Sequence, residues 1–235
     1  MEAIDAAVRT TREVNAKLRQ LIVDGCRDIT IRNSGAKHNL AVAVLDPVRV
    51  RIEGSVGYYC GGLTDGASID VHGSAGWGLA ESMLSGEVRV RGNAGSGAAA
   101  ALRGGTVVIH GDAAARLGVS MKGGQVIVAG NCGFMGGFMA QKGTLIVCGN
   151  AGEAFADSMY STVCYVGGRI AGLGTDAVLS SMSDTEAQEL EATLNDCLPP
   201  ELVTRMTPAR NFQKVVAGRK LWNFDKHERI WQEAL

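Results

Sequence analysis

Glycine recurs every 19 residues along most of the chain, and this period constrains the fold more than any other feature. The repeating positions, called anchors below, are Gly54, Gly73, Gly92, Gly111, Gly130, Gly149 and Gly168. The residues four and two positions before each anchor are apolar, as Val50 and Ile52 are before Gly54. A small residue follows each anchor by three positions, and a second glycine turn follows most anchors by twelve or thirteen. Each unit is therefore predicted to be a short alternating strand, a tight corner, a second side and a turn.

A unit of this size cannot bury its apolar face alone, so successive units must stack on one another. Helical repeats need longer units, and leucine-rich repeats need a ladder of leucines that the sequence lacks. We therefore expect an all-β fold, a parallel β-helix of about seven coils, roughly 30 Å long at the usual strand spacing. We expect right-handed winding, although the period does not fix the hand, and glycine anchors because only glycine adopts the corner dihedrals.

The expected outward face of the strands changes character halfway along the rod. Residues three and one positions before the anchors point outward; they are charged in early coils, as Arg51 and Glu53, and apolar in later ones, as Ile127 and Ile146. An exposed apolar strip of that length is unusual in a monomer, so either the chain's own C-terminal part or a partner subunit covers it. Ile127 and Ile146 are accordingly predicted partner-docking residues.

Helical signals flank the repeats and divide the chain into three parts. Capping boxes at 10–13 and 183–186 each predict a helix that caps one end of the rod. The predicted parts are an N-terminal helical cap (1–28), the β-helix (29–178), and a C-terminal helix with a docking tail (179–235). The tail combines basic and aromatic residues, and its predicted docking residues are Lys220, Trp222 and Phe224.

Composition excludes several classes of function. The formal net charge of −1 argues against binding nucleic acid or an anionic membrane surface. No apolar run is long enough to span a membrane, and the N-terminus lacks signal-peptide features. The six cysteines are scattered, which favours reduced thiols in a cytoplasmic protein over disulfides or a zinc site.

The sequence offers no catalytic, cofactor or metal site. The glycine-rich corners recur with the repeat and are therefore architecture rather than a nucleotide-binding motif. The polar residues after the anchors are expected to bond their own backbone rather than calcium. Glu53 and Asp70 are an isolated carboxylate pair, and His72 and His110 are expected on the surface, two coils apart and too distant to share a metal.

The phased corners resemble the glutamate synthase C-terminal domain family, a glycine-rich β-helix also found in a subunit of formylmethanofuran dehydrogenase. Several segments are more specifically similar to the stand-alone β-helix subunit of N-methylglutamate synthase. They are residues 12–15 (REVN), 73–78 (GSAGWG), 104–109 (GGTVVI), 141–149 (QKGTLIVCG) and 218–224 (GRKLWNF).

This resemblance implies a structural subunit of a hetero-oligomer with methylamine–glutamate N-methyltransferase activity. It implies two partners, an amidotransferase-like subunit and an FMN-binding subunit with an iron–sulfur cluster, and no cofactor on this chain. The alternatives are the same scaffold in a glutamate synthase or a formyltransferase/hydrolase-type complex, or a stand-alone β-solenoid binding module.

Overall fold

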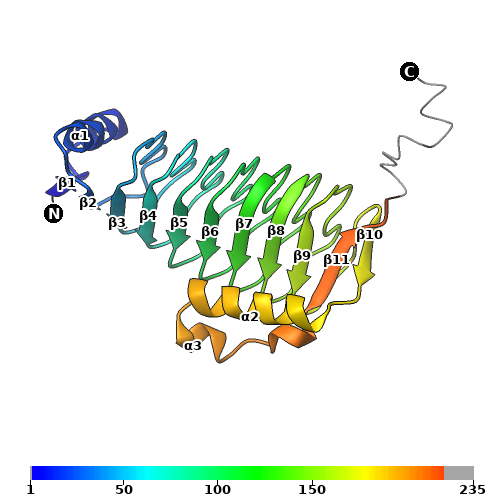
Figure 1. The fold of residues 1–235 in the computed structure, drawn as a ribbon. Helices are drawn as coiled ribbons and strands as arrows, with labels where there is room; N and C mark the ends of the chain where they lie inside the picture. Colours follow the sequence, from blue (N-terminus) through cyan, green and yellow to red (C-terminus); the bar gives the residue numbers. More distant parts are fainter. Residues whose placement is uncertain (1, 220–235) are drawn as a thin grey trace, which may run out of the picture.

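The first nine strands stack in chain order along a rod, and the last strand of the described chain lies between the ninth and the tenth (Figure 1). The structure, a computed structural model, describes residues 2–219. Its strands are β1 (Glu2–Asp5), β2 (Asp28–Arg32), β3 (Arg49–Glu53), β4 (Ser68–His72), β5 (Glu87–Val90), β6 (Thr106–Ile109), β7 (Lys122–Val128), β8 (Lys142–Val147), β9 (Val163–Val166), β10 (Ala177–Ser180) and β11 (Gln213–Ala217). Its helices are α1 (Thr11–Val23), α2 (Asp184–Cys197), α3 (Pro200–Val203) and the short 3-10 turn Ala209–Asn211.

The register of the sheet reproduces the sequence period and confirms a parallel β-solenoid of about 7 turns. Val50 pairs with Ile69 and Ile69 with Val88, so equivalent residues lie side by side on neighbouring strands. The residues four and two before each anchor are buried in one continuous core. That core also holds the residues ten positions after the anchors, such as Met83, Met121 and Met159. Alternation along each strand therefore separates the interior from the outward face.

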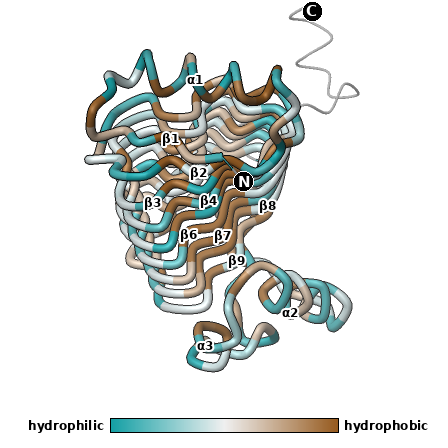
Figure 2. Tube along the Cα trace, turned by 90° about the vertical axis from the view of Figure 1, so that its left-hand side faces the viewer, coloured by the Kyte–Doolittle hydropathy of each residue, from teal (hydrophilic) through white to brown (hydrophobic). Residues whose placement is uncertain are grey.

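The two ends of the rod are closed differently. Helix α1 packs Val14, Leu18, Leu21 and Ile22 onto the first coil and acts as the expected N-terminal cap. At the other end, β11 pairs antiparallel with β9, and β10 pairs antiparallel with β11. Helix α2 lies along the outside of the sheet instead of over the end (Figure 2). The expectation of a helical cap at both ends is therefore wrong for the C-terminal end.

The anchor glycines are required by close approach between coils more than by backbone dihedrals. Among the seven anchors only Gly54 has a positive φ, of 103°. A Cβ atom added to Gly73 would lie 2.5 Å from the backbone nitrogen of Ser55 on the preceding coil. Real Cβ atoms do not approach backbone this closely, so a side chain there would force the coils apart. The dihedral explanation given by the sequence is corrected accordingly.

A ladder of polar side chains joins the corners of successive coils. Asn93 Oδ1 accepts a hydrogen bond from the backbone nitrogen of Asp112 at 2.9 Å, and Asp112 Oδ1 accepts one from Asn131 at 2.7 Å. Asn131 continues the pattern to Asn150 at 2.8 Å. The sequence predicted that these side chains would bond their own backbone. They bond the backbone of the next coil instead, so that prediction is wrong. The ladder satisfies backbone donors that the tight corners would otherwise leave without partners.

The second side of each coil uses left-handed backbone at regular positions. In one coil Gly97, Ala99 and Ala101 have φ values of 70°, 58° and 51°. This conformation costs a non-glycine residue about 1–2 kcal/mol. Hydrogen bonds to both neighbouring coils offset the cost: Ala99 N donates to Leu79 O at 2.7 Å, and Ala101 N donates to Val119 O at 2.8 Å.

Candidate functional site

The apolar half of the outward face is covered by the chain itself. Val108, Ile127 and Ile146 are buried, and they form a second hydrophobic cluster with Leu190 and Leu194 of α2. Leu198 and Phe212 extend the cluster beyond the helix. Ile127 and Ile146 are thus not available to a partner, and their predicted docking role is wrong because α2 occupies that position.

The remaining predicted docking residues, Lys220, Trp222 and Phe224, lie outside the described residues.

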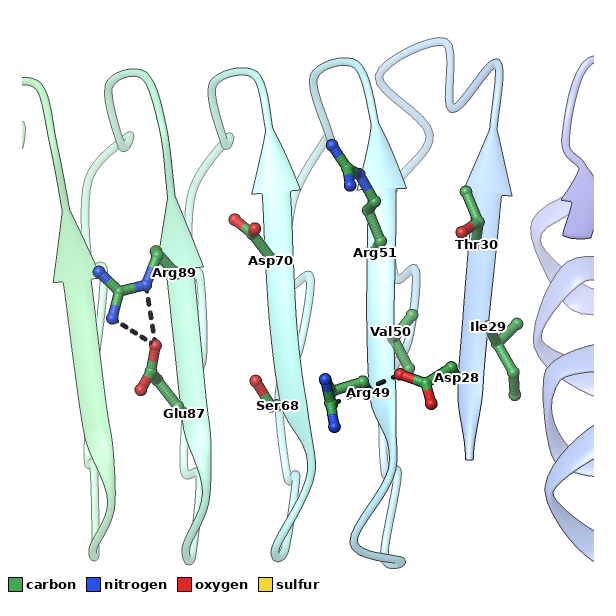
Figure 3. A pocket seen from close by; sticks show the side chains of 10 residues that line it. All are labelled: Asp28, Ile29, Thr30, Arg49, Val50, Arg51, Ser68, Asp70, Glu87 and Arg89. Carbon is green, nitrogen blue, oxygen red and sulfur yellow. Dashed lines mark hydrogen bonds and ion pairs between the residues drawn. The ribbon is translucent and has the colours of Figure 1, made fainter. Parts of the chain in front are cut away.

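The charged half of the outward face, on β2–β5, is open and carries a shallow pocket of about 280 Å³ (Figure 3). It is lined by Asp28, Ile29, Thr30, Arg49, Val50, Arg51, Ser68, Asp70, Glu87 and Arg89. Helix α2 ends at the border of this region, where Arg89 donates a hydrogen bond to the carbonyl oxygen of Cys197. The face is therefore divided into a covered apolar half and an open polar half.

Most charges on the open half are already paired. Arg49 Nε lies 3.4 Å from Asp28, and an Arg89 terminal nitrogen lies 2.7 Å from Glu87. Glu53, one of the two carboxylates considered for catalysis, lies 3.6 Å from Arg32. Each of these carboxylates is neutralised by an arginine of its own or a neighbouring strand. Such paired charges are more typical of a structural surface than of a reactive one.

Asp70, the second carboxylate, is held by two hydrogen-bond donors. Arg91 donates two hydrogen bonds to it, at 3.1 and 2.8 Å, and His72 Nε2 donates a third at 2.9 Å. Partial burial acts to raise the pKa of Asp70, but the hydrogen bonds from Arg91 and His72 outweigh it and leave the pKa below its ordinary value. An ionised carboxylate held this way is not suited to act as a general acid.

Arg51 differs from the other arginines of this face. Its guanidinium lies 3.2 Å from His72 Nδ1, and because a guanidinium only donates, that nitrogen is the acceptor. Within residues 2–219, Arg51 forms no ion pair with a carboxylate. It is therefore the cation of this face whose charge is least compensated.

His110 lies deeper than the sequence suggested. It is only partly exposed, and its Nε2 atom is buried without a hydrogen-bond partner, so the expectation of a surface histidine is corrected. Burial lowers its pKa below the ordinary value, and the positive charges of Arg89 and Arg91 lower it further. The negative charges of Asp70 and Glu201 act in the opposite direction but do not outweigh these effects.

A row of aromatic rings on one corner was not anticipated. His38 stacks on Tyr58 with ring centroids 4.4 Å apart, and Tyr58 stacks on Trp77 at 5.3 Å. Trp77, which ends the row, is 57% exposed. The available signal was that Tyr58 and Trp77 both follow their anchors by four positions, which places them on successive coils.

The cysteines and the metal-binding side chains support no reactive centre in the described part of the chain. All six cysteines are free, and four are buried: Cys60, Cys132, Cys148 and Cys164. Burial raises the pKa of the Cys60 thiol to about 12, which disfavours the nucleophilic thiolate. Among residues 2–219, no three His, Cys, Asp or Glu side chains are grouped closely enough to hold a metal ion. None of the described helices is long and apolar enough to cross a bilayer.

Comparison with known proteins gives a partial match. No protein-family profile matches the chain. The chain is similar to Protein GlxC of Rhizobium meliloti (strain 1021), with 41% identity over 68 residues. The matched segment spans 28% of this chain and 29% of that protein, so the likeness is local on both sides.

Proposed function

We propose that the chain is a non-catalytic structural subunit of a glutamate-synthase-like complex, most specifically N-methylglutamate synthase. That complex converts methylamine and L-glutamate to N-methyl-L-glutamate and ammonia. In this proposal the rod holds an amidotransferase-like subunit and an FMN/iron–sulfur subunit in a fixed relation, and the cofactors belong to the partner.

The observation that carries the proposal is the solenoid itself, built from the same phased glycine corners on which the family resemblance rests. A rod of stacked coils is stiff along its axis and exposes different chemistry on different sides, which suits a spacer between two larger subunits. Here those sides include the charged open face on β2–β5 and the aromatic row that ends at Trp77. The fold alone does not specify the reaction, so the named enzyme is supported by the sequence resemblance.

Two alternatives use the same architecture. An equivalent scaffold in a glutamate synthase or a formyltransferase/hydrolase-type complex would have different partners. A stand-alone binding module is favoured by one observation, the exposed stack of His38, Tyr58 and Trp77, since exposed ring faces are common in ligand-binding surfaces.

Co-expression with the amidotransferase-like and FMN-binding subunits of the same genome tests the proposal. We expect one large species in size-exclusion chromatography that absorbs as FMN and forms N-methylglutamate, and a colourless small species when this chain is expressed alone. Omitting this chain should separate the other two subunits. A pair of subunits that assembles and turns over equally well without the rod would overturn the proposal.

A variant pair tests whether the tail contributes to docking. Trp222→Ala combined with Phe224→Ala should weaken the complex, whereas Phe134→Ala, an exposed aromatic on the described rod, serves as the matched control. Full assembly of the double variant would remove the tail from the docking surface without removing the scaffold role.

A further inference from the structure

The open face on β2–β5 has a hollow over Ser68, and two arginines border it from the same strand. Across the sheet, Ser68 lies between Arg49 and Glu87, and Asp70 lies between Arg51 and Arg89. Ser68 is much shorter than these neighbours, so it forms the floor of the pocket. Figure 3 shows both guanidinium groups on the β4 side of β3: that of Arg49 lies beside Ser68, whereas that of Arg51 lies farther along the strand, beyond Asp70.

The charges around the hollow do not balance at β3. Glu87 is paired with Arg89, and both oxygens of Asp70 are engaged by Arg91 and His72. Arg49 has one carboxylate, Asp28, at 3.4 Å, while its own side chain is 78% exposed. Arg51 has none within the described residues and donates only to a neutral acceptor nitrogen. This face therefore presents two accessible guanidinium groups, and that of Arg51 keeps donor capacity for a carboxylate that none of the described residues fills.

The shape of the site identifies the class of ligand. The pocket lies on the flat face of a sheet, whereas a small-molecule site buries most of its ligand. A free carboxylic acid would keep much of its surface in water here. A nucleic acid is disfavoured because four carboxylates, Asp28, Glu53, Asp70 and Glu87, lie on the same face and would repel a polyanion.

We propose that Arg51 receives an acidic side chain from a partner polypeptide that docks on β2–β5, beside the end of α2, with Arg49 as a second cation along the same strand. The alternating charges around the hollow then select register, since a misplaced acidic group would meet Asp70 or Glu87. This inference rests on the proposed function only in taking the polypeptide to be a subunit of the same complex; the recognition of a carboxylate stands on the geometry alone.

Direct titration tests the recognition with the full chain. The probe is a blocked Glu-Glu dipeptide, followed by amide chemical shifts in two-dimensional NMR, with blocked Gln-Gln as the neutral control. We expect saturable shifts centred on Ser68, Asp70 and Arg51 with Glu-Glu alone. In the Arg49→Gln/Arg51→Gln variant the affinity should fall at least about tenfold, the loss typical of a charge-assisted hydrogen bond. Equal shifts with Gln-Gln, or an unchanged affinity in the double variant, would overturn the inference.

Arg103→Gln is the matched control, because Arg103 is an exposed arginine on a corner away from this face. A thermal unfolding curve of each variant checks that the fold is kept. Arg51→Gln also removes the contact between Arg51 and His72. His72→Gln removes that contact but keeps the arginine, and it should leave the dipeptide affinity within about twofold of the unmodified chain.

Assembly separates this inference from the proposed function. If the unmodified chain forms the three-subunit complex and the double arginine variant does not, while Arg103→Gln does, both ideas are supported. If the double variant assembles normally, the docking inference fails and the scaffold function stands. If the unmodified chain does not assemble, the proposed function fails, and the dipeptide titration still decides whether the hollow recognises a carboxylate.

Discussion

Replacing Gly73 with alanine tests whether the coil corners are governed by space or by backbone angle. The added Cβ would lie 2.5 Å from Ser55 N, 2.6 Å from the carbonyl carbon of Gly54 and 2.8 Å from its oxygen. All three atoms are backbone, so no side chain can rotate away. Restoring an ordinary contact requires the coils to separate locally by about 0.9 Å. That movement would stretch neighbouring inter-coil bonds such as Ser74 N to Ser55 Oγ, now 3.0 Å.

The expected cost follows from these contacts. Overpacking costs about 1–3 kcal/mol, and two weakened hydrogen bonds add about 1 kcal/mol each, so Gly73→Ala should lower the free energy of unfolding by about 3 kcal/mol or more. Gly97→Ala is the matched control: its φ is 70°, and no atom lies within 4 Å of an added Cβ. Left-handed strain of about 1–2 kcal/mol, reduced by the lower entropy of the unfolded chain, leaves a cost of about 1 kcal/mol.

Urea unfolding of the two variants, followed by circular dichroism, measures the difference. We expect Gly73→Ala to be less stable than Gly97→Ala by about 2 kcal/mol with unchanged denaturant dependence. Equal destabilisation would mean that the close approach of the preceding coil costs no more than the backbone strain at Gly97, which would refute the close-approach explanation of the anchors. If Gly97→Ala lost more unfolding free energy than Gly73→Ala, backbone strain would be the larger of the two effects.

Three further predictions concern the outward face and the corner ladder. Ile127→Ala should cost about 2–4 kcal/mol because it empties space beneath α2, and hydrogen exchange should then speed up in α2 first; uniform exchange across the rod would contradict this coupling. Asn131→Ala should cost about 1–2 kcal/mol, since Asn131 bonds both Asp112 and the backbone of Asn150; a neutral result in urea unfolding would show that water replaces the ladder. Because the pKa of His110 is lower in the folded chain than in the unfolded chain, the unfolded state binds more protons and stability should decline as pH falls below about 6.5. His110→Gln should flatten that decline between pH 7 and 5 in thermal unfolding, and an unchanged pH profile would assign the dependence to other groups.

The repeat made most of the rod predictable, because each residue's role is set by its position relative to an anchor. The buried positions such as Val50 and Ile69 follow from alternation alone. The placement of α2 does not, since a helix with an apolar stripe fits the rod's end or its side equally well. Only the length of the apolar strip that includes Ile127 and Ile146 indicated a cover, and the sequence left open whether that cover was a partner.

The polar features of the face were harder to foresee. The contacts of Arg51, His72 and Asp70 join side chains on different coils, and their pairing depends on rotamers rather than on spacing. The left-handed residues of the second side, such as Ala99, carry no compositional signature because alanine and leucine occupy positions that usually favour glycine.

The antiparallel closure by β11 and β10 has a consequence for how the rod behaves at its end. A solenoid coil is a template, because its last strand presents free backbone donors and acceptors to any segment of matching register. Strand β11 is inserted antiparallel between β9 and β10, so the coil-to-coil pairing of the sheet is interrupted there and β10 becomes the edge. β10 is only four residues long, and a short edge strand offers few backbone groups to a second molecule. The inserted strand and the short edge therefore disfavour the end-to-end pairing of rods that a repeat of this kind invites.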